Sequence, residues 1–174
     1  MVDFSSERIM NIKKKMFLMS GVPGSGKSFL ADQIAELYSA IVCSADDYFI
    51  KGETYNFDRT KLGHAHAGCR YNAQTAIQAG YNVVVDNTNV SHKELKPYID
   101  MALSANYDIF VVRPNTPWAN NAIECHKRCT HNVPLETIQR MDLSLVNLMI
   151  DEKSVGQVDK GYKVINTIEE IESW

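Results

Sequence analysis

Short apolar runs alternate with longer amphipathic segments along most of the chain. The runs are rich in β-branched residues and apolar at consecutive positions, which is typical of strands buried on both faces of a parallel sheet. This alternation predicts a three-layer α/β fold, in which helices cover both faces of a five-stranded, mostly parallel sheet. The expected strands are Met16–Ser20, Ala40–Cys43, Asn82–Asp86, Asp108–Arg113 and Tyr162–Ile165.

The segments between these runs repeat apolar residues at helical spacing. Gly80 suits a helix C-terminus, Ser91 with Glu94 resembles a capping box, and Pro117 suits a first helical turn. A first helix is marked by Phe29, Leu30, Ile34, Ala35, Leu37 and Tyr38. The later expected helices are Thr60–Ala79, Ser91–Ala105, Pro117–Thr130 and Pro134–Ile150.

The chain of 174 residues has about the length of one domain. We expect residues 1–15 to form an N-terminal arm and residues 16–174 a single domain. Within that domain, the polar segment Asp151–Gly161 is expected to be a loop. The Glu-rich, helix-like tail Thr167–Trp174 suits either a cover for the sheet edge or a contact with a partner.

The composition is that of a folded globular protein, with 45% hydrophobic and 22% charged residues. A net charge of −3 argues against a protein that binds nucleic acid through overall positive charge, although a local basic groove remains open. No apolar stretch approaches the length of a membrane span, and the first residues lack the apolar centre of a signal peptide, so we expect no membrane contact and a cytoplasmic protein.

Cys125 and Cys129 lie one helical turn apart with His126 between them, which raises the question of a zinc site. No second paired cluster completes four ligands, so burial as small apolar side chains is the better interpretation.

The turn after the first expected strand carries a phosphate-binding pattern. Residues 21–28 fit G-x-x-x-x-G-K-[ST], a loop whose backbone N–H groups point at an anion while the helix N-terminus adds positive potential. Lys27 is expected to reach the β- and γ-phosphates and Ser28 to bind Mg²⁺. The pattern predicts a P-loop NTPase or kinase fold with ATP or GTP and Mg²⁺ as ligands. The expected nucleotide-binding residues are Gly21, Val22, Pro23, Gly24, Ser25, Gly26, Lys27, Ser28 and Phe29.

Carboxylates follow two further strands, at the edge where ligands of open α/β sheets bind. Asp86 ends the third expected strand and is a candidate to position Mg²⁺, the alternative being an aspartate that only begins a turn. Asp46 and Asp47 follow the second strand, where one could accept the proton of a hydroxyl that is being phosphorylated. Capping of the next helix is an equally good role for Asp47.

Cationic residues surround a break between the last two expected helices, at 130–134. We interpret residues 117–140 as a lid that closes over the triphosphate. An arginine delivered in this way stabilises charge on the transferred phosphoryl group, although surface cations are often only solvated. The cations concerned are Lys127, Arg128, His131 and Arg140, of which Arg128 is the main catalytic candidate.

Four segments together resemble the polynucleotide-kinase-like P-loop family, namely GVPGSGKS, SADDY, VVVDNTN and WANNAIECHKRCTHNVP. This family includes phage and animal 5′-hydroxyl polynucleotide kinases and the kinase-like domains of a ubiquitin-ligase-binding protein and of animal cyclic-nucleotide phosphodiesterase. The resemblance covers about residues 16–150 and implies transfer of the γ-phosphate of ATP to a hydroxyl, usually the 5′-OH of RNA or DNA. By position it implies Lys27 and Ser28 as the phosphate-loop pair, Asp46 as general base and acceptor contact, and Arg128 as the lid arginine. The acceptor side would also include Asp86, Asn87, Thr88 and Asn89.

Two positions depart from the family pattern. The well-studied polynucleotide kinases have an arginine before the general base, and the phage type has another three residues after it, but this chain has Ala45 and Phe49 there. The downstream arginine reads a phosphate of the acceptor. Nearby cations could form a substitute cationic wall, and nearby aromatic residues could stack a base of the acceptor. The cations are Lys51, Arg59, Lys61, His64, His66 and Arg70, and the aromatic residues are Tyr48, Phe49, Tyr55 and Phe57.

These observations favour an ATP-dependent 5′-hydroxyl polynucleotide kinase. The absent arginines and the acidic pI of about 5.9 keep open a kinase of a nucleoside or another small hydroxylated molecule. A module that binds ATP or GTP and transfers nothing is an alternative of a different class.

Overall fold

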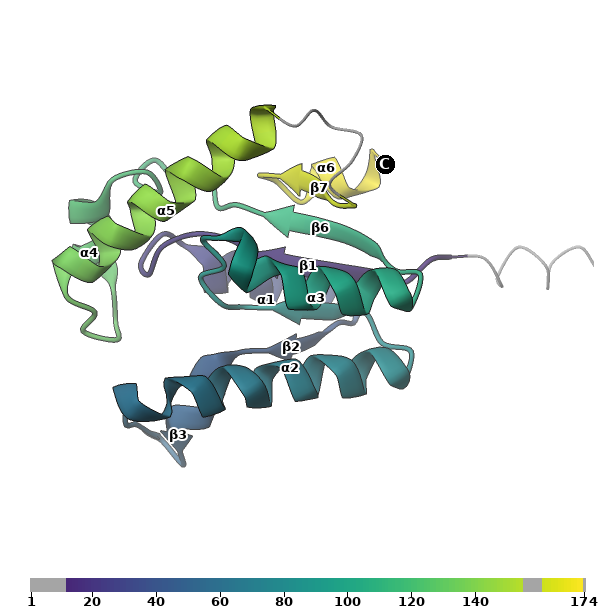
Figure 1. Cartoon of the computed structure of the whole chain (residues 1–174), viewed down its shortest axis with the longest axis horizontal. Coiled ribbons are helices and arrows are strands. Elements are labelled where there is room, and N and C mark those ends of the chain that lie inside the picture. Colours follow the sequence, from purple (N-terminus) through teal and green to yellow (C-terminus); the bar gives the residue numbers. More distant parts are fainter. Residues whose placement is uncertain (1–11, 155–160, 174) are drawn as a thin grey trace, which may run out of the picture.

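Five parallel strands form the central layer of the protein, in the order β2-β5-β1-β6-β7 (Figure 1). The structure is a computed structural model that describes residues 12–154 and 161–173. β1 lies in the middle, where Phe17 pairs with Val84 of β5 and with Phe110 of β6. All four pairings in this sheet are parallel, so the predicted strands and their direction are confirmed. The strands are β1 (Lys15–Met19), β2 (Ile41–Cys43), β5 (Val83–Val85), β6 (Asp108–Val112) and β7 (Lys163–Ile165).

Helices cover both faces of the sheet, which confirms the three-layer arrangement. Successive residues of β1 point to opposite faces, so that Met16 and Leu18 join one apolar cluster, whereas Phe17 and Met19 join the other. The first cluster is covered by α2 (Leu62–Gln78), α3 (His92–Ser104) and α5 (Leu135–Ser154). The second is covered by α1 (Lys27–Tyr38) and α6 (Glu169–Glu172).

Two helix boundaries differ from the expectation. The helix predicted from Pro117 begins only at Ala122, as α4 (Ala122–Arg128), because the side chain of Asn121 accepts a hydrogen bond from Glu124 N and caps it there. α5 continues to Ser154, so the first part of the expected loop 151–161 is helical. The rest of that loop, residues 155–160, lies outside the described residues.

A small hairpin after β2 was not expected. Its strands β3 (Ile50–Lys51) and β4 (Thr54–Tyr55) are antiparallel and follow the 3₁₀ helix η1 (Ala45–Phe49). A second 3₁₀ helix, η2 (Arg59–Lys61), leads into α2. Strands of two residues are too short to leave an alternating pattern in the sequence.

The chain ends fit the expectations in part. Residues 1–11 of the expected arm lie outside the described residues, and β1 begins at Lys15. In the C-terminal tail, α6 buries Ile171 in the same apolar cluster as Ile165 of β7. Within residues 12–154 and 161–173, every helix is too short or too polar to cross a membrane.

Candidate active site

The C-terminal ends of β1, β2 and β5 bring the predicted site segments to one edge of the sheet. Backbone contacts join the loop after β1 to the segment after β5, since Gly21 N donates to Thr88 O at 2.8 Å. Ser20 Oγ donates to Asn89 O at 2.9 Å, and Asn89 Nδ2 donates to Met19 O at 2.8 Å. The 86–89 segment therefore supports the phosphate loop.

The phosphate loop has the conformation of an anion cradle. Gly24 and Gly26 have φ values of +78° and +101°, a region that L side chains rarely adopt. Lys27 is buried, and its Nζ donates to Val22 O at 2.9 Å, across the loop. Because α1 begins at Lys27, the positive end of its dipole faces the same loop.

The residues present fit a magnesium ion. Ser28 Oγ donates to Asp86 Oδ2 at 2.8 Å, which brings the two predicted metal residues together. The other carboxylate oxygen, Asp86 Oδ1, is buried and has no hydrogen-bond partner among the described residues. Hydroxyl and carboxylate oxygens beside bound phosphates are the donors that Mg²⁺ uses in nucleotide sites.

Burial shifts the pKa values of two of these groups, Lys27 and Asp86, in opposite directions. Burial lowers the pKa of Lys27, while the nearby Asp86 and Asp46 carboxylates partly restore it. Burial raises the pKa of Asp86, partly offset by the hydrogen bond from Ser28 and by the charge of Lys27. Such shifts are common at sites that hold charged ligands.

Asn87 and Asn89, predicted as substrate-binding residues, make contacts within the protein. Asn87 Oδ1 accepts a hydrogen bond from Ala45 N at 2.9 Å, and its Nδ2 contacts Cys69 and Tyr98. Both asparagine side chains are buried. Their side chains therefore attach η1 and the end of β1 to the segment after β5.

Asp46 lies in the first turn of η1, and two residues from other segments approach its carboxylate. The hydroxyl of Tyr55, in β4, donates a hydrogen bond to Asp46 Oδ1 at 3.1 Å. His131, from the loop between α4 and α5, places Nδ1 3.5 Å from Asp46 Oδ2. The rings of Tyr55 and His131 stack with centroids 4.3 Å apart. The sequence indicated Tyr55 and His131 separately but not that they meet.

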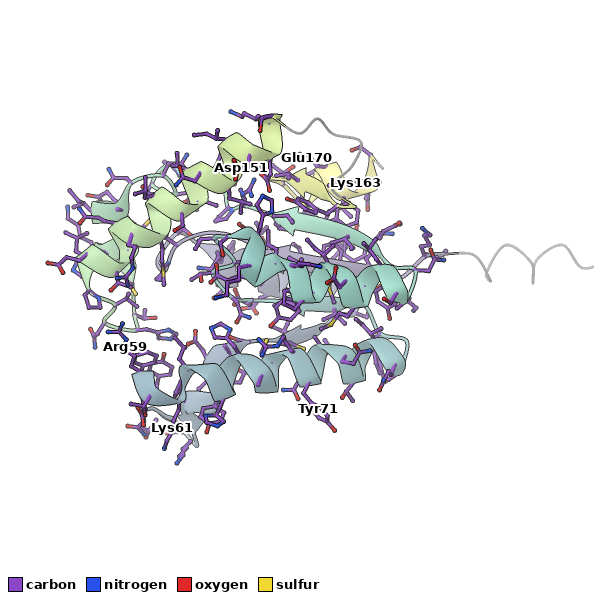
Figure 2. The ribbon with its side chains drawn as sticks, in the orientation of Figure 1. Arg59, Lys61, Tyr71, Asp151, Lys163 and Glu170 are labelled. Atoms are coloured by element: carbon purple, nitrogen blue, oxygen red, sulfur yellow. The ribbon has the colours of Figure 1, made fainter. Side chains whose placement is uncertain are left out.

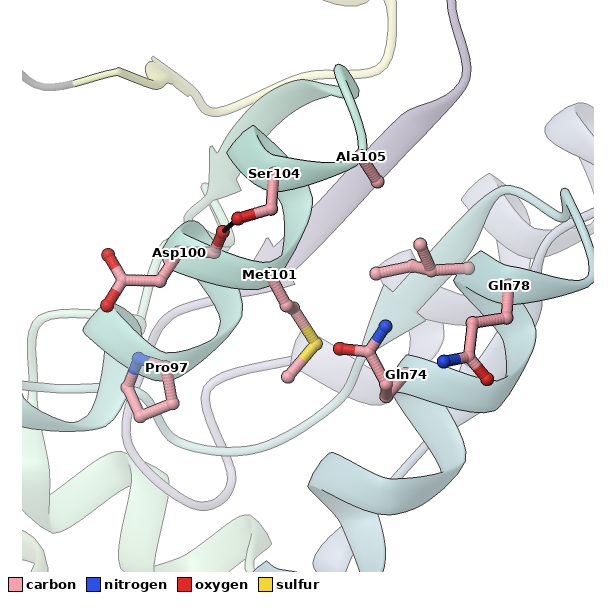
Figure 3. Close-up of a pocket in the computed structure, with 8 residues that line it drawn as sticks. Gln74, Gln78, Pro97, Asp100, Met101, Ser104 and Ala105 are labelled. Atoms are coloured by element: carbon pink, nitrogen blue, oxygen red, sulfur yellow. Dashed lines mark hydrogen bonds between the residues drawn. The ribbon is translucent and has the colours of Figure 1, made fainter.

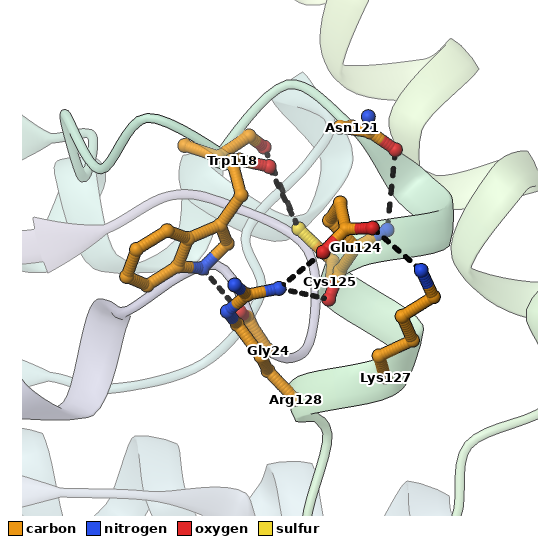
Figure 4. Close-up of polar contacts among 8 residues, drawn as sticks. Gly24, Trp118, Asn121, Glu124, Cys125, Lys127 and Arg128 are labelled. Atoms are coloured by element: carbon orange, nitrogen blue, oxygen red, sulfur yellow. Dashed lines mark hydrogen bonds and ion pairs between the residues drawn. The ribbon is translucent and has the colours of Figure 1, made fainter.

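Arg128 lies at the edge of the phosphate loop, where it contacts the protein (Figure 4). Its Nη1 is 2.6 Å from Glu124 Oε2, and the guanidinium lies 4.3 Å above the ring of Trp118. Trp118 in turn donates its indole N–H to Gly24 O at 3.1 Å. Sequence reasoning missed Trp118 and Glu124, although the four-residue spacing of Glu124 and Arg128 is a usual signal for an ion pair on one helix.

The remaining phosphate-loop residues divide into packed and open positions. Val22 is buried in an apolar cluster with Cys125 and Ile138, which joins the loop to α4 and α5. Pro23 is partly exposed, and Phe29, on the first turn of α1, is 74% exposed.

The positions that lack the family's arginines point into the protein. Ala45 and Phe49 are 6% and 3% exposed, and both belong to the core cluster under α2. Exposed cations are found instead in η2, just before α2, where Figure 2 labels Arg59 and Lys61. That end of α2 is on the same side of the molecule as the α4–α5 loop.

A separate groove of about 540 Å³ lies between α2 and α3 (Figure 3). Its lining includes Gln74, Gln78 and Met101 and none of the predicted site residues. The strand ends, rather than this groove, are therefore the candidate active site.

Comparison with known proteins places this chain in a family. The AAA domain family matches residues 16–148. NEDD4-binding protein 2 of Homo sapiens is 37% identical over 128 residues, which is 72% of this chain and 7% of that protein. The 2′,3′-cyclic-nucleotide 3′-phosphodiesterase of Rattus norvegicus is 29% identical over 134 residues, 74% of this chain and 30% of that protein. This chain thus spans less than a third of either relative.

Among solved structures, a chain of the Pnkp1/Rnl/Hen1 RNA repair complex has the same fold. It superposes with a TM-score of 0.65 at 20% identity, covering 84% of this chain and 49% of that one. With the curated relatives, this match confirms the resemblance predicted from the sequence motifs.

Proposed function

Because this chain belongs to the AAA domain family and has a kinase-like P-loop fold, we propose that it transfers the γ-phosphate of ATP to a hydroxyl group. The observation that carries this proposal is the pairing of Ser28 with Asp86 at 2.8 Å, beside the buried Lys27. That pairing joins the phosphate loop to a strand-end carboxylate, as a nucleotide and its metal require.

On the donor side, the backbone of residues 21–26 and Lys27 hold the phosphates. Ser28 and Asp86 would hold Mg²⁺, which screens negative charge on the phosphates when bound. GTP fits the same loop chemistry, so the preference for ATP is part of the proposal. Arg128 would leave Glu124 to contact the triphosphate, since its guanidinium already lies beside the loop at Trp118.

On the acceptor side, Asp46 acts as general base. Its side chain is 47% exposed, so an acceptor hydroxyl can reach it. The hydroxyl oxygen forms a bond to the γ-phosphorus, its proton passes to the Asp46 carboxylate, and the bond to the β,γ-bridging oxygen breaks as ADP leaves with the electron pair.

We propose the 5′-OH of RNA or DNA as the acceptor. The motif resemblance supports it, as do the exposed Lys51, Arg59 and Lys61 near the start of α2, which suit a phosphate backbone. A small hydroxylated molecule is the second candidate. It is favoured by the burial of Ala45 and Phe49, because no side chain at these two positions faces an acceptor phosphate.

The test is transfer from γ-labelled ATP to a panel of 5′-OH RNA, 5′-OH DNA, nucleosides and sugars. We expect label on the nucleic acids and at least about a hundredfold less with Lys27→Ala, which removes the phosphate contact. Label on small molecules alone would establish the second candidate. Nucleotide binding with no transfer to any acceptor would identify a non-catalytic module.

A further inference from the structure

The Asp46 carboxylate is contacted from both sides by residues of different segments. Tyr55 belongs to the hairpin after β2, and its hydroxyl holds Oδ1 at 3.1 Å. His131 belongs to the α4–α5 loop and lies 3.5 Å from Oδ2. The stacked rings, tilted by only 12°, join the hairpin to that loop.

We propose that Tyr55 and His131 are positioning residues that orient Asp46 for proton transfer when the α4–α5 loop lies over the acceptor site. This inference rests on the proposed function and adds to it the coupling between the loop and the base. Tyr55 fixes one oxygen, so that Oδ2 is the oxygen that receives the hydroxyl proton. His131 lies beside that oxygen. By stacking on Tyr55, it also keeps the Tyr55 hydroxyl in place and so helps to fix the orientation of the Asp46 carboxylate.

The strength of these contacts suits a reversible closure. The His131 and Asp46 side chains are 42% and 47% exposed, and a polar contact this open to solvent is weak. The stack of the Tyr55 and His131 rings adds only a modest attraction to this contact. The contact can therefore open to admit an acceptor and close again without a large barrier.

The same loop serves the donor side. Arg128 ends α4 beside the phosphate loop, and His131 follows it by three residues at the acceptor side. One movement of this segment would thus place a charge near the triphosphate and orient the base.

The kinetic test uses Tyr55→Phe, which keeps the ring but removes the hydroxyl, and His131→Ala. Each is expected to lower kcat about tenfold or more with little change in KM for ATP, because a hydrogen bond or polar contact to the base is lost. His131→Gln, which keeps a polar donor, should recover part of the loss. Tyr71→Phe, at an exposed tyrosine of α2, is the matched control and should keep wild-type kcat.

A double-variant cycle separates positioning from general damage. In an Asp46→Asn background, Tyr55→Phe and His131→Ala should cause no further loss, since they act only through that carboxylate. Losses that multiply with that of Asp46→Asn would overturn the proposal.

A measurement without substrate checks the stacking itself. In NMR spectra, the His131 ring protons should be shifted upfield by the Tyr55 ring, and Tyr55→Leu should remove that shift while Tyr71→Leu leaves it. An unshifted His131 in a protein that transfers phosphate would overturn this inference alone. Failure of the unaltered protein to phosphorylate any acceptor, with the stack present, would instead overturn the proposed function.

Discussion

Arg113 and Glu152 form a two-pronged ion pair inside the protein, with Nη1–Oε2 and Nη2–Oε1 distances of 2.6 and 2.9 Å. Their side chains are 9% and 5% exposed. Arg113 follows β6, whereas Glu152 lies in the last turn of α5 and also accepts a hydrogen bond from Tyr162 at 2.8 Å. The pair attaches the end of α5 to the sheet.

Removing one partner should leave the other charge buried. We expect Glu152→Gln to lower the free energy of unfolding by about 3–5 kcal/mol. Tyr162→Phe, which removes only one hydrogen bond to the same carboxylate, should lower it by about 1.5–3 kcal/mol. Urea unfolding followed by circular dichroism measures both. A Glu152→Gln protein as stable as the unaltered one would show that the pair contributes nothing to stability.

Gly24 should tolerate no side chain. A Cβ there would overlap the backbone oxygen of Cys125 in α4, in addition to the strain of a φ of +78°. Gly24→Ala should therefore lower the free energy of unfolding by more than about 1 kcal/mol and weaken ATP binding by displacing the loop. Gly63→Ala is the control, because a Cβ at this helical glycine meets nothing within 4 Å. It should stabilise the protein by about 0.4–1 kcal/mol. Thermal unfolding with and without ATP distinguishes the two variants.

Asp86 should make stability depend on pH. Burial raises its pKa above the ordinary value of 3.8, so the folded state holds this proton more tightly than the unfolded chain. The contribution to stability is then full below pH 3.8 and is lost as the pH rises through the folded pKa. Relative to Asp86→Asn, which carries no charge, the unaltered protein should become less stable as the pH rises above 3.8 and through the raised pKa of Asp86. Equal pH profiles for both proteins would contradict this expectation.

Asp46→Asn should separate binding from chemistry. Since the amide cannot accept the hydroxyl proton, transfer should fall more than about a hundredfold while ATP affinity changes little. Titration with a fluorescent ATP analogue measures affinity, and γ-label transfer measures turnover. Asp47→Asn, a change in the exposed neighbouring residue, is the control. Unchanged turnover in Asp46→Asn would remove this residue from the mechanism.

The central sheet and the phosphate loop could be predicted because their signals are local. Five apolar runs correspond to the five strands, and the pattern at 21–28 lies between a strand and a helix. The hairpin at Ile50–Tyr55 was missed because its strands are too short for periodicity. The start of α4 was misplaced because Pro117 was expected in its first turn, whereas Asn121 caps the helix.

Contacts between segments far apart in the chain could not be predicted from the sequence. The amides of Asn87 and Asn89 follow a strand at the ligand edge, and only the fold reveals that they face the protein. In the same way, no spacing rule connects Asp46 with His131, because the contact depends on how the α4–α5 loop crosses the sheet. Residue types at the site could be predicted, but not which of them meet.

α5 gives the loop that carries His131 a fixed end. The C-terminal part of the helix is held by the ion pair of Glu152 with Arg113, and near its N-terminal end Ile138 is buried with Val22 and Cys125. The helix is therefore held to the sheet at one end and to the phosphate loop at the other. A change in the distance between His131 and Asp46 would thus come from the short connection between α4 and α5 and not from the helices on either side of it.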